Sequence, residues 1–238
     1  MYFIILNNNI KGNSMNDMQI ISIVNFVRGG KSSIARLLAE KANTSILNFD
    51  PKRNGEFYNA VKTNNIPEDA KITRNKNSIE IEADTEIMTL KSSSNMFICD
   101  FGGRFDERIN EFKSDIYIVP FMDDFESISE SIRATKYILS GNPQANIIHI
   151  LNMAMCSDRG ERKDFEDGYI SLMNTNSLSH IEYIKMPRSK LVKKLINEKL
   201  KKKDIQGTSK FLELGAYKNI NKFIEKLVYT INKQLGEN

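Results

Sequence analysis

A short segment of glycine, lysine and serine carries the clearest chemical signal in this sequence. The apolar stretch 20–24 leads into it, and an amphipathic stretch with Ile34, Leu37 and Leu38 follows. A glycine turn between a strand and a helix lets backbone N–H groups approach a phosphate, and the helix dipole points its positive end at that anion. In the standard spacing G-x-x-x-x-G-K-[ST], Asn25 stands where the first glycine would be. We therefore predict phosphate contacts from Arg28, Gly29, Gly30, Lys31, Ser32 and Ser33.

Acidic residues end two other apolar stretches and suggest a metal ion beside the phosphates. Asp100 follows Met96-Phe-Ile-Cys99, and Asp50 follows Ser45-Ile-Leu-Asn-Phe49. Carboxyl ends of parallel strands share one edge of a sheet. There Asp100 would hold Mg²⁺ opposite the Ser32 hydroxyl, and Asp50 would orient an attacking water. The alternative for each Asp is a helix cap.

Gly102 and Gly103 follow Asp100, with only Phe101 between. Glycines there would let the backbone approach a γ-phosphate and move when it leaves, as switch segments do. The alternative is a tight turn without that role.

Length and composition predict one α/β domain. The chain has 238 residues, 40% of them hydrophobic, enough for a sizeable core. We expect residues 1–18 to form a poorly ordered extension, with Met1, Met15 or Met18 as the start, and residues 19–238 to form a single domain. No apolar run reaches the roughly 18–20 residues of a membrane span, and Cys99 and Cys156 suggest no disulfide framework. A cytoplasmic protein without a stable membrane anchor fits best.

Strand and helix patterns alternate along most of the chain. This predicts a mostly parallel sheet flanked by helices, of the P-loop NTPase type. Between these elements we expect a polar helix over 55–63, one strand over 78–82 and a short helix over 86–91. The principal strands are expected at 19–25, 45–49, 96–99, 116–119, 147–151 and 181–185, and the principal helices at 31–42, 125–139 and around 220–231.

Basic residues crowd one segment of a chain whose net charge is only +4. Such a segment can bind nucleic acid or an anionic membrane, and it can equally be a solvated helix face. The final helix lacks a separate basic amphipathic motif, which favours DNA. The candidate DNA contacts are Lys190, Lys193, Lys194, Lys199, Lys201, Lys202 and Lys203. We expect His149, which lies within an apolar strand, to be a core histidine. Neither His149 nor His180 suggests a metal site.

Taken together, these motifs resemble the ParA/MinD family of deviant Walker ATPases from about Gln19 to the C-terminus. The family order is kept: the Gly-Gly-Lys-Ser-Ser segment, Asn48-Phe-Asp-Pro51, Phe97-Ile-Cys-Asp-Phe-Gly-Gly103, Ile150-Leu-Asn152 and Met186-Pro-Arg188. The resemblance implies that Lys31 binds the β- and γ-phosphates and that Asn152 and Pro187 lie near the adenine. It also implies an ATP-dependent homodimer that binds DNA or membrane nonspecifically and releases it on hydrolysis.

The sequence also departs from the family pattern. Phe26 replaces the signature lysine that reaches the nucleotide of the other subunit, and Arg28 is the candidate substitute. Asn48 replaces an acid, and Lys52 a glutamine. We therefore expect nucleotide binding to be retained and hydrolysis to be weak.

The sequence thus predicts a partition ATPase that uses ATP and Mg²⁺, binds nonspecific DNA, and works with a centromere-binding adaptor protein to segregate a plasmid or similar replicon. One alternative is an ATP-dependent small-molecule ligase or kinase of the same fold. Another is a nucleotide-switch scaffold that does not hydrolyse ATP.

Overall fold

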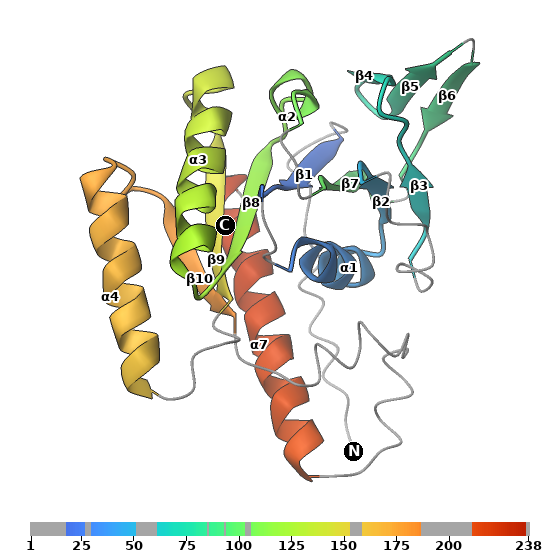
Figure 1. The fold of residues 1–238 in the computed structure, drawn as a ribbon. Helices are drawn as coiled ribbons and strands as arrows, with labels where there is room; N and C mark the ends of the chain where they lie inside the picture. The colour runs from blue at the N-terminus through green and yellow to red at the C-terminus, as the bar shows by residue number, and fades with distance from the viewer. Residues whose placement is uncertain are drawn as a thin grey trace.

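A seven-stranded parallel sheet forms the centre of the molecule (Figure 1). The computed structural model describes residues 18–26, 30–50, 61–84, 86–92, 94–102, 106–152, 159–186 and 211–236. The strand order is β10-β9-β8-β1-β7-β2-β3, and every neighbouring pair is parallel. The strands are β1 (Gln19–Ile23), β2 (Ser45–Asn48), β3 (Thr63–Asn65), β7 (Met96–Asp100), β8 (Ile116–Met122), β9 (Asn146–Asn152) and β10 (Glu182–Met186).

Helices cover both faces of this sheet, which gives three layers. Along β8, Ile116 and Ile118 pack on one face, whereas Tyr117 and Val119 pack on the other, because successive side chains of a strand point to opposite faces. The isoleucine face is covered by α1 (Lys31–Ala42) and α7 (Phe211–Gln234). The opposite face is covered by α2 (Arg108–Glu111), α3 (Phe125–Gly141) and α4 (Arg159–Thr175).

The predicted apolar stripe of the final helix is buried. Ile220, Phe223, Ile224, Leu227 and Ile231 all contribute to the core between α7 and the sheet. Their spacing places them on one side of an α-helix, which has about 3.6 residues per turn. The stripe is therefore core, as the sequence predicted.

A second, antiparallel sheet follows β3 and corrects the expectations for this region. It contains β4 (Lys71–Arg74), β5 (Ile79–Ala83) and β6 (Glu86–Leu90) in that order. The strand predicted over 78–82 is confirmed as β5. The short helix predicted over 86–91 is wrong, because this segment pairs with β5 as the second strand of a hairpin.

Two other helix expectations also need correction. The helix predicted over 55–63 is wrong at its end, because Thr63 begins β3 and pairs with Ile46; residues 51–60 lie outside the described part. The sequence did not predict α4, whose described buried residues are Tyr169 and Met173 alone. An apolar face so sparse gives little periodic signal.

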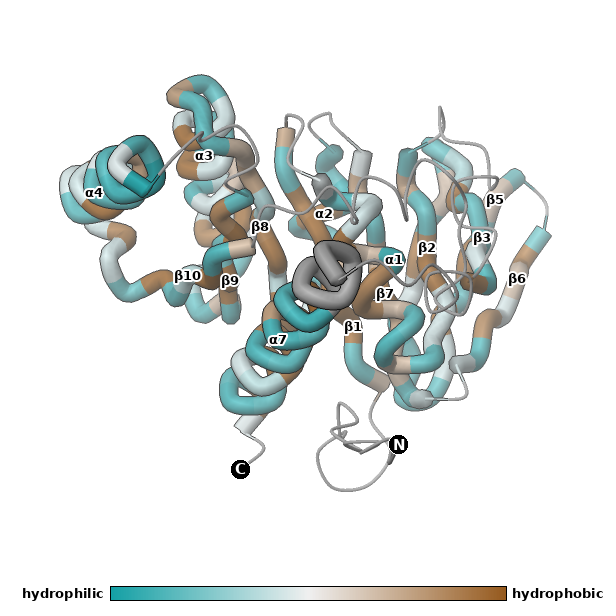
Figure 2. The backbone as a smooth tube through the Cα atoms, turned by 90° about the horizontal axis from the view of Figure 1, so that it is seen from below, coloured by the Kyte–Doolittle hydropathy of each residue, from teal (hydrophilic) through white to brown (hydrophobic). Residues whose placement is uncertain are grey.

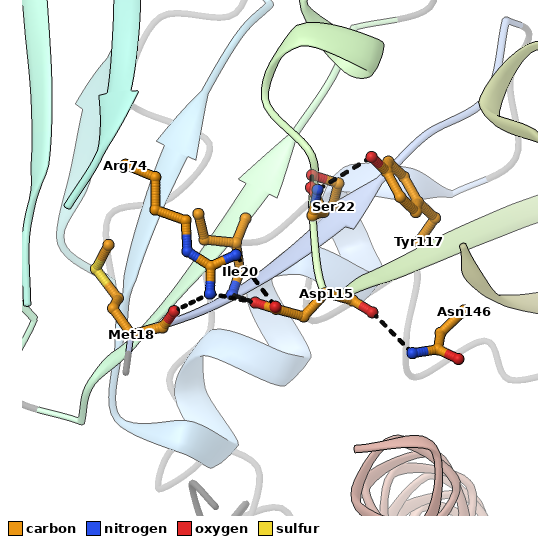
Figure 3. A network of polar contacts seen from close by, with 8 residues as sticks. Met18, Ile20, Ser22, Arg74, Asp115, Tyr117 and Asn146 are labelled. Atoms are coloured by element: carbon orange, nitrogen blue, oxygen red, sulfur yellow. Dashed lines mark hydrogen bonds and ion pairs between the residues drawn. The ribbon is translucent and has the colours of Figure 1, made fainter. Parts of the chain in front are cut away.

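Arg74 attaches the small sheet to the amino-terminal edge of the large one (Figure 3). Its guanidinium donates to both carboxylate oxygens of Asp115, at 3.1 and 3.0 Å, and to the carbonyl of Met18. The same carboxylate accepts the backbone N–H of Ile20 at 2.7 Å.

None of the helices in the described part of the chain has the length and apolar character of a membrane span.

Candidate functional site

The predicted site residues converge at the carboxyl-terminal edge of the large sheet, opposite the Arg74 attachment. Asp100 is the last residue of β7 and lies in register with Ile23 of β1 and Asn48 of β2. Asn152 is the last residue of β9. Strand β1 lies between β7 and β8. The chain runs from β1 through α1 to β2 on one side of β1, and later crosses from β7 to β8 on its other side. Parallel α/β sheets bind ligands at such a switch point.

Gly30 forms the turn into α1, as the sequence predicted. It is the N-cap residue, with φ 84° and ψ 20°, a left-handed conformation that favours glycine. A β-carbon built on Gly30 would lie 3.3 Å from Nδ2 of Asn152. The turn and the end of β9 are therefore adjacent, although they are far apart in the sequence.

The first turn of α1 suits an anion. Lys31 and Ser32 are its first two residues, and both are buried. The turn contains no acidic residue, and the N-cap glycine has no side chain with which to cap the helix. Helices usually place an acid or a capping oxygen at this end to offset the dipole. A phosphate could take that role here, with Lys31 as an additional positive charge.

Asp50 and Gly102 meet on the other side of the site. A β-carbon on Gly102 would lie 3.2 Å from Cγ of Asp50. Asn48 holds the turn that carries Asp50: its Oδ1 accepts the Asp50 N–H at 3.1 Å, and its Nδ2 donates to Asn65 Oδ1 at 2.9 Å. The residue that replaces the family acid is thus a buried structural amide. We did not predict this role, which depends on the β2–β3 pairing.

Asp100 is buried, with 1% of its surface exposed. The alternative reading of Asp100 as a helix cap is wrong, because the next described helix begins only at Arg108, where Asp106 accepts the Arg108 N–H. Hard cations such as Mg²⁺ take oxygen ligands, and they are commonly held by one or two carboxylates together with phosphate oxygens. A buried carboxylate at the strand end and the hydroxyl of Ser32 are the correct donor types. Among the described residues, no group of three or more His, Cys, Asp and Glu side chains forms a metal-binding cluster.

Asn25 and Phe26 explain why the start of the loop departs from the glycine pattern. Asn25 is buried; its Nδ2 donates to the Pro120 carbonyl at 2.5 Å and its Oδ1 accepts the Phe26 N–H at 2.7 Å. The side chain thereby continues the contact between β1 and β8 beyond the Val24–Ile118 backbone hydrogen bond. A glycine could not provide this connection.

Phe26 packs against α3. Its ring centroid lies 6.3 Å from that of Tyr137, and the Arg133 guanidinium carbon lies 5.5 Å from it. Only 9% of Phe26 is exposed. Phe26 is thus part of the hydrophobic core on this face of the sheet.

The structure confirms that His149 is a core residue. Its Nε2 lies 2.7 Å from Thr135 Oγ1 and its Nδ1 lies 2.9 Å from Tyr169 Oη. Burial lowers the pKa of His149 to about 3, because a charged imidazolium would be desolvated there. Burial also raises the pKa of the Cys99 thiol, which is a free buried cysteine. We place neither residue in the candidate site.

Several predicted site residues lie outside the described part of the chain. They are Arg28, Gly29, Gly103, Pro187, Lys190, Lys193, Lys194, Lys199, Lys201, Lys202 and Lys203.

With this geometry established, the chain can be compared with known proteins. No protein-family model and no curated protein sequence matches it. The structure of apo McdA from Cyanothece is 13% identical, with a TM-score of 0.54, and the match covers 92% of this chain and 99% of that chain. An Asp-to-Ala variant of Cyanothece McdA in complex with ATP is 12% identical, with a TM-score of 0.55 and coverage of 94% and 98%. The chain has the fold of McdA.

The match to McdA confirms the predicted fold class, an α/β fold with a mostly parallel sheet flanked by helices. A putative plasmid partition protein from Borrelia burgdorferi bound to AMPPNP also matches, with 13% identity, a TM-score of 0.47 and coverage of 89% and 100%. At these identities the comparisons establish the fold alone.

Proposed function

We propose that this chain binds ATP with Mg²⁺ at the carboxyl-terminal edge of its sheet and hydrolyses it slowly. The observation that carries the proposal is the Gly30 turn: a left-handed glycine opens a helix whose first turn contains Lys31 and Ser32 and no acid. Asp100 ends β7, which pairs directly with the strand that ends at Asn48, two residues before Asp50, and Asn152 lies against the turn itself. Phosphate, metal and base contacts would thus come from separate, fixed elements.

Each residue has a distinct role in this proposal. Lys31 would bind the β- and γ-phosphates, and Ser32 and Asp100 would hold Mg²⁺, which would neutralise charge on the phosphates. Asp50 orients the attacking water. Arg28 is proposed to neutralise charge on the transferring phosphate, and Asn152 and Pro187 to lie at the base.

A second candidate, a nucleotide switch that binds ATP with little or no turnover, is favoured by one observation. Phe26, at the position of the family's signature lysine, packs in its own subunit against Tyr137 and Arg133. A phenyl ring carries no charge, so Phe26 cannot replace the lysine that would neutralise a phosphate on a second subunit. The rate of ATP hydrolysis distinguishes the two candidates, because tight ATP binding without turnover supports the switch alone.

In the cell we propose a cytoplasmic partition protein that associates with the nucleoid. ATP would drive a homodimer that binds nonspecific DNA through the lysines of the 190–203 segment and responds to a centromere-binding adaptor protein. The fold it shares with McdA and the basic composition of that segment support this proposal.

ATP binding by Lys31→Ala tests the nucleotide site. We expect titration calorimetry to give a Kd about 10- to 100-fold higher than that of the wild type, because a hydrogen-bonded charge on phosphate is lost. Lys41→Ala is the matched control, since Lys41 lies in the last turn of the same helix. Equal ATP affinity of wild type and Lys31→Ala would refute the phosphate-loop assignment.

A salt series of duplex DNA binding, with and without ATP–Mg²⁺, tests the partition role. Neutralisation of phosphates releases counterions, so log affinity should fall steeply and linearly with log salt concentration. ATP-dependent binding of this kind supports the partition switch. The absence of DNA binding in both states would instead favour a scaffold or a metabolic enzyme of the same fold.

A further inference from the structure

We propose that the outer edge of β6 binds an extended, basic segment of another protein, which adds to the small sheet as a fourth strand. In the described part of the chain, β6 pairs with β5 on one side only. It lies at the margin of the molecule in both overall views (Figures 1 and 2). An edge strand offers a row of backbone donors and acceptors to an added strand.

The side chains of β6 make this edge unusually apolar. Ile87 is 69% exposed and Met88 is 51% exposed, two of the five large hydrophobic side chains that are exposed in the described residues. Edge strands are commonly protected by lysine or proline, and β6 contains neither between Glu86 and Leu90. The other edge strand of the same sheet, β4, carries Lys71 and Arg74.

The hairpin register shows which backbone groups face outward. Two residues separate the paired residues Ala83 and Glu86, and Asp84 has φ 53°, as in the tight turns that close β-hairpins. The pair flanking such a loop is hydrogen-bonded, and the pairs alternate beyond it. Met88 therefore points its N–H and C=O toward Ile81 on β5. Ile87 and Thr89 point theirs toward the open side.

The acidic side chains around β6 indicate that the added strand is basic. Between Ile79 and Leu90 there are four acidic residues and no basic one. Pairing of β6 with β6 of a second copy would bring eight carboxylates together, and like charges across strands are destabilising. The nearby Arg74 already forms an ion pair with Asp115. An added strand that alternates apolar and basic residues would either cover Met88 and place its basic side chains on the side of Glu80 and Glu82, or cover Ile87 and place them on the side of Glu86.

The β6 edge belongs to the small sheet, which Arg74 ties to the amino-terminal edge of the large one. The inference therefore does not depend on nucleotide binding, and each can fail without the other.

Binding of a short fluorescent peptide of alternating Lys and Val tests the inference with the full chain. We expect fluorescence anisotropy to show saturable binding that a peptide of alternating Glu and Val does not reproduce. Thr89→Pro should weaken binding about tenfold, because it removes one outward N–H donor at an edge position that tolerates proline. Thr89→Val, which keeps the N–H, should bind like the wild type.

A second variant and amide exchange make the test independent of the folding of Thr89→Pro. Ile87→Lys removes the apolar contact, adds a like charge and should also weaken binding. Hydrogen exchange of the Ile87 and Thr89 amides should be fast in the free protein and slow with the peptide. Slow exchange without peptide, from a second copy or from another segment of this chain, would overturn the proposal. So would equal binding of both peptides, or wild-type binding by Thr89→Pro and Ile87→Lys.

Discussion

Gly102 lies against Asp50, so closely that a β-carbon on the glycine would approach Cγ of the carboxylate to 3.2 Å. The two residues follow different strands, β7 and β2, which pair in parallel. The contact links the acid that we propose to orient water with the glycine that we propose as a switch. A substitution at Gly102 should therefore displace the side chain of Asp50.

Gly102→Ala tests this contact. The added methyl must displace the Asp50 side chain by a few tenths of an ångström, and small misplacements of a catalytic group are costly. We expect kcat for ATP hydrolysis to fall about tenfold with little change in KM. The control is Gly168→Ala in α4, where a β-carbon meets nothing within 4 Å; it should leave turnover unchanged and can stabilise the helix by up to about 1 kcal/mol. Equal kcat values for the two variants would contradict the coupling.

Phe26→Lys asks whether the family's signature lysine can be restored. We expect urea unfolding to show a loss of about 2–4 kcal/mol, because a charge would replace a buried ring beside the Arg133 guanidinium. Phe26→Leu should cost about 1 kcal/mol. Phe125→Lys is the control, since Phe125 is exposed on α3, and should stay within about 0.5 kcal/mol. Wild-type stability together with faster ATP hydrolysis in Phe26→Lys would instead show that this position accepts the lysine.

The buried His149 should make the protein sensitive to acid. Thr135 Oγ1 lies 2.8 Å from the Ser131 carbonyl, so a network in which every group is satisfied has Thr135 donating to Ser131, His149 Nε2–H donating to Thr135, and Tyr169 donating to Nδ1. A proton on Nδ1 would break the last of these bonds. The pKa of His149 is lowered from 6.5 to about 3 by burial.

Between about pH 3 and pH 6.5, His149 binds a proton in the unfolded chain but not in the folded chain. The free energy of unfolding should therefore fall with decreasing pH, by about 1.4 kcal/mol per pH unit from this residue. In denaturant titrations from pH 7 to pH 5, His149→Gln should show a shallower decline than the wild type. His180→Gln changes an exposed histidine and should keep the wild-type slope. Identical slopes for all three proteins would place the pKa of His149 near its ordinary value.

Arg74 should contribute measurably to stability from its position between the two sheets. It donates to Asp115 and to the Met18 carbonyl. Because about a third of the Arg74 and Asp115 side chains is exposed, solvent screening limits the effect. We expect Arg74→Met to lower the free energy of unfolding by about 1–2 kcal/mol, whereas Lys71→Met on the exposed side of the same strand should change it by less than about 0.5 kcal/mol. Equal effects would mean that the attachment adds no stability.

Local patterns were sufficient for six of the seven strands of the large sheet and for the helix that follows Gly30. The strands that end at Asp100 and Asn152 are short and predominantly apolar, and the helix after Gly30 begins at Lys31 as predicted. These features depend on neighbours within a few residues, since periodicity, glycine conformation and helix starts are local properties. The predictions for Lys31, Ser32, Asp50 and Asp100 followed from the same patterns, and the parallel sheet places these residues at one edge.

Long-range pairing decided the rest. The sequence could not show that β7 inserts between β1 and β2, that Asn25 bonds to Pro120, or that the segment 86–90 pairs with β5 rather than forming a helix. In each case the energy comes from a partner many residues away, or from a cross-strand contact that overrides local helix propensity. The sequence by itself therefore determined the fold class and the residue types proposed for the site, and the tertiary structure decided which residues meet. Backbone hydrogen bonds and burial between distant strands are settled only when the whole chain packs.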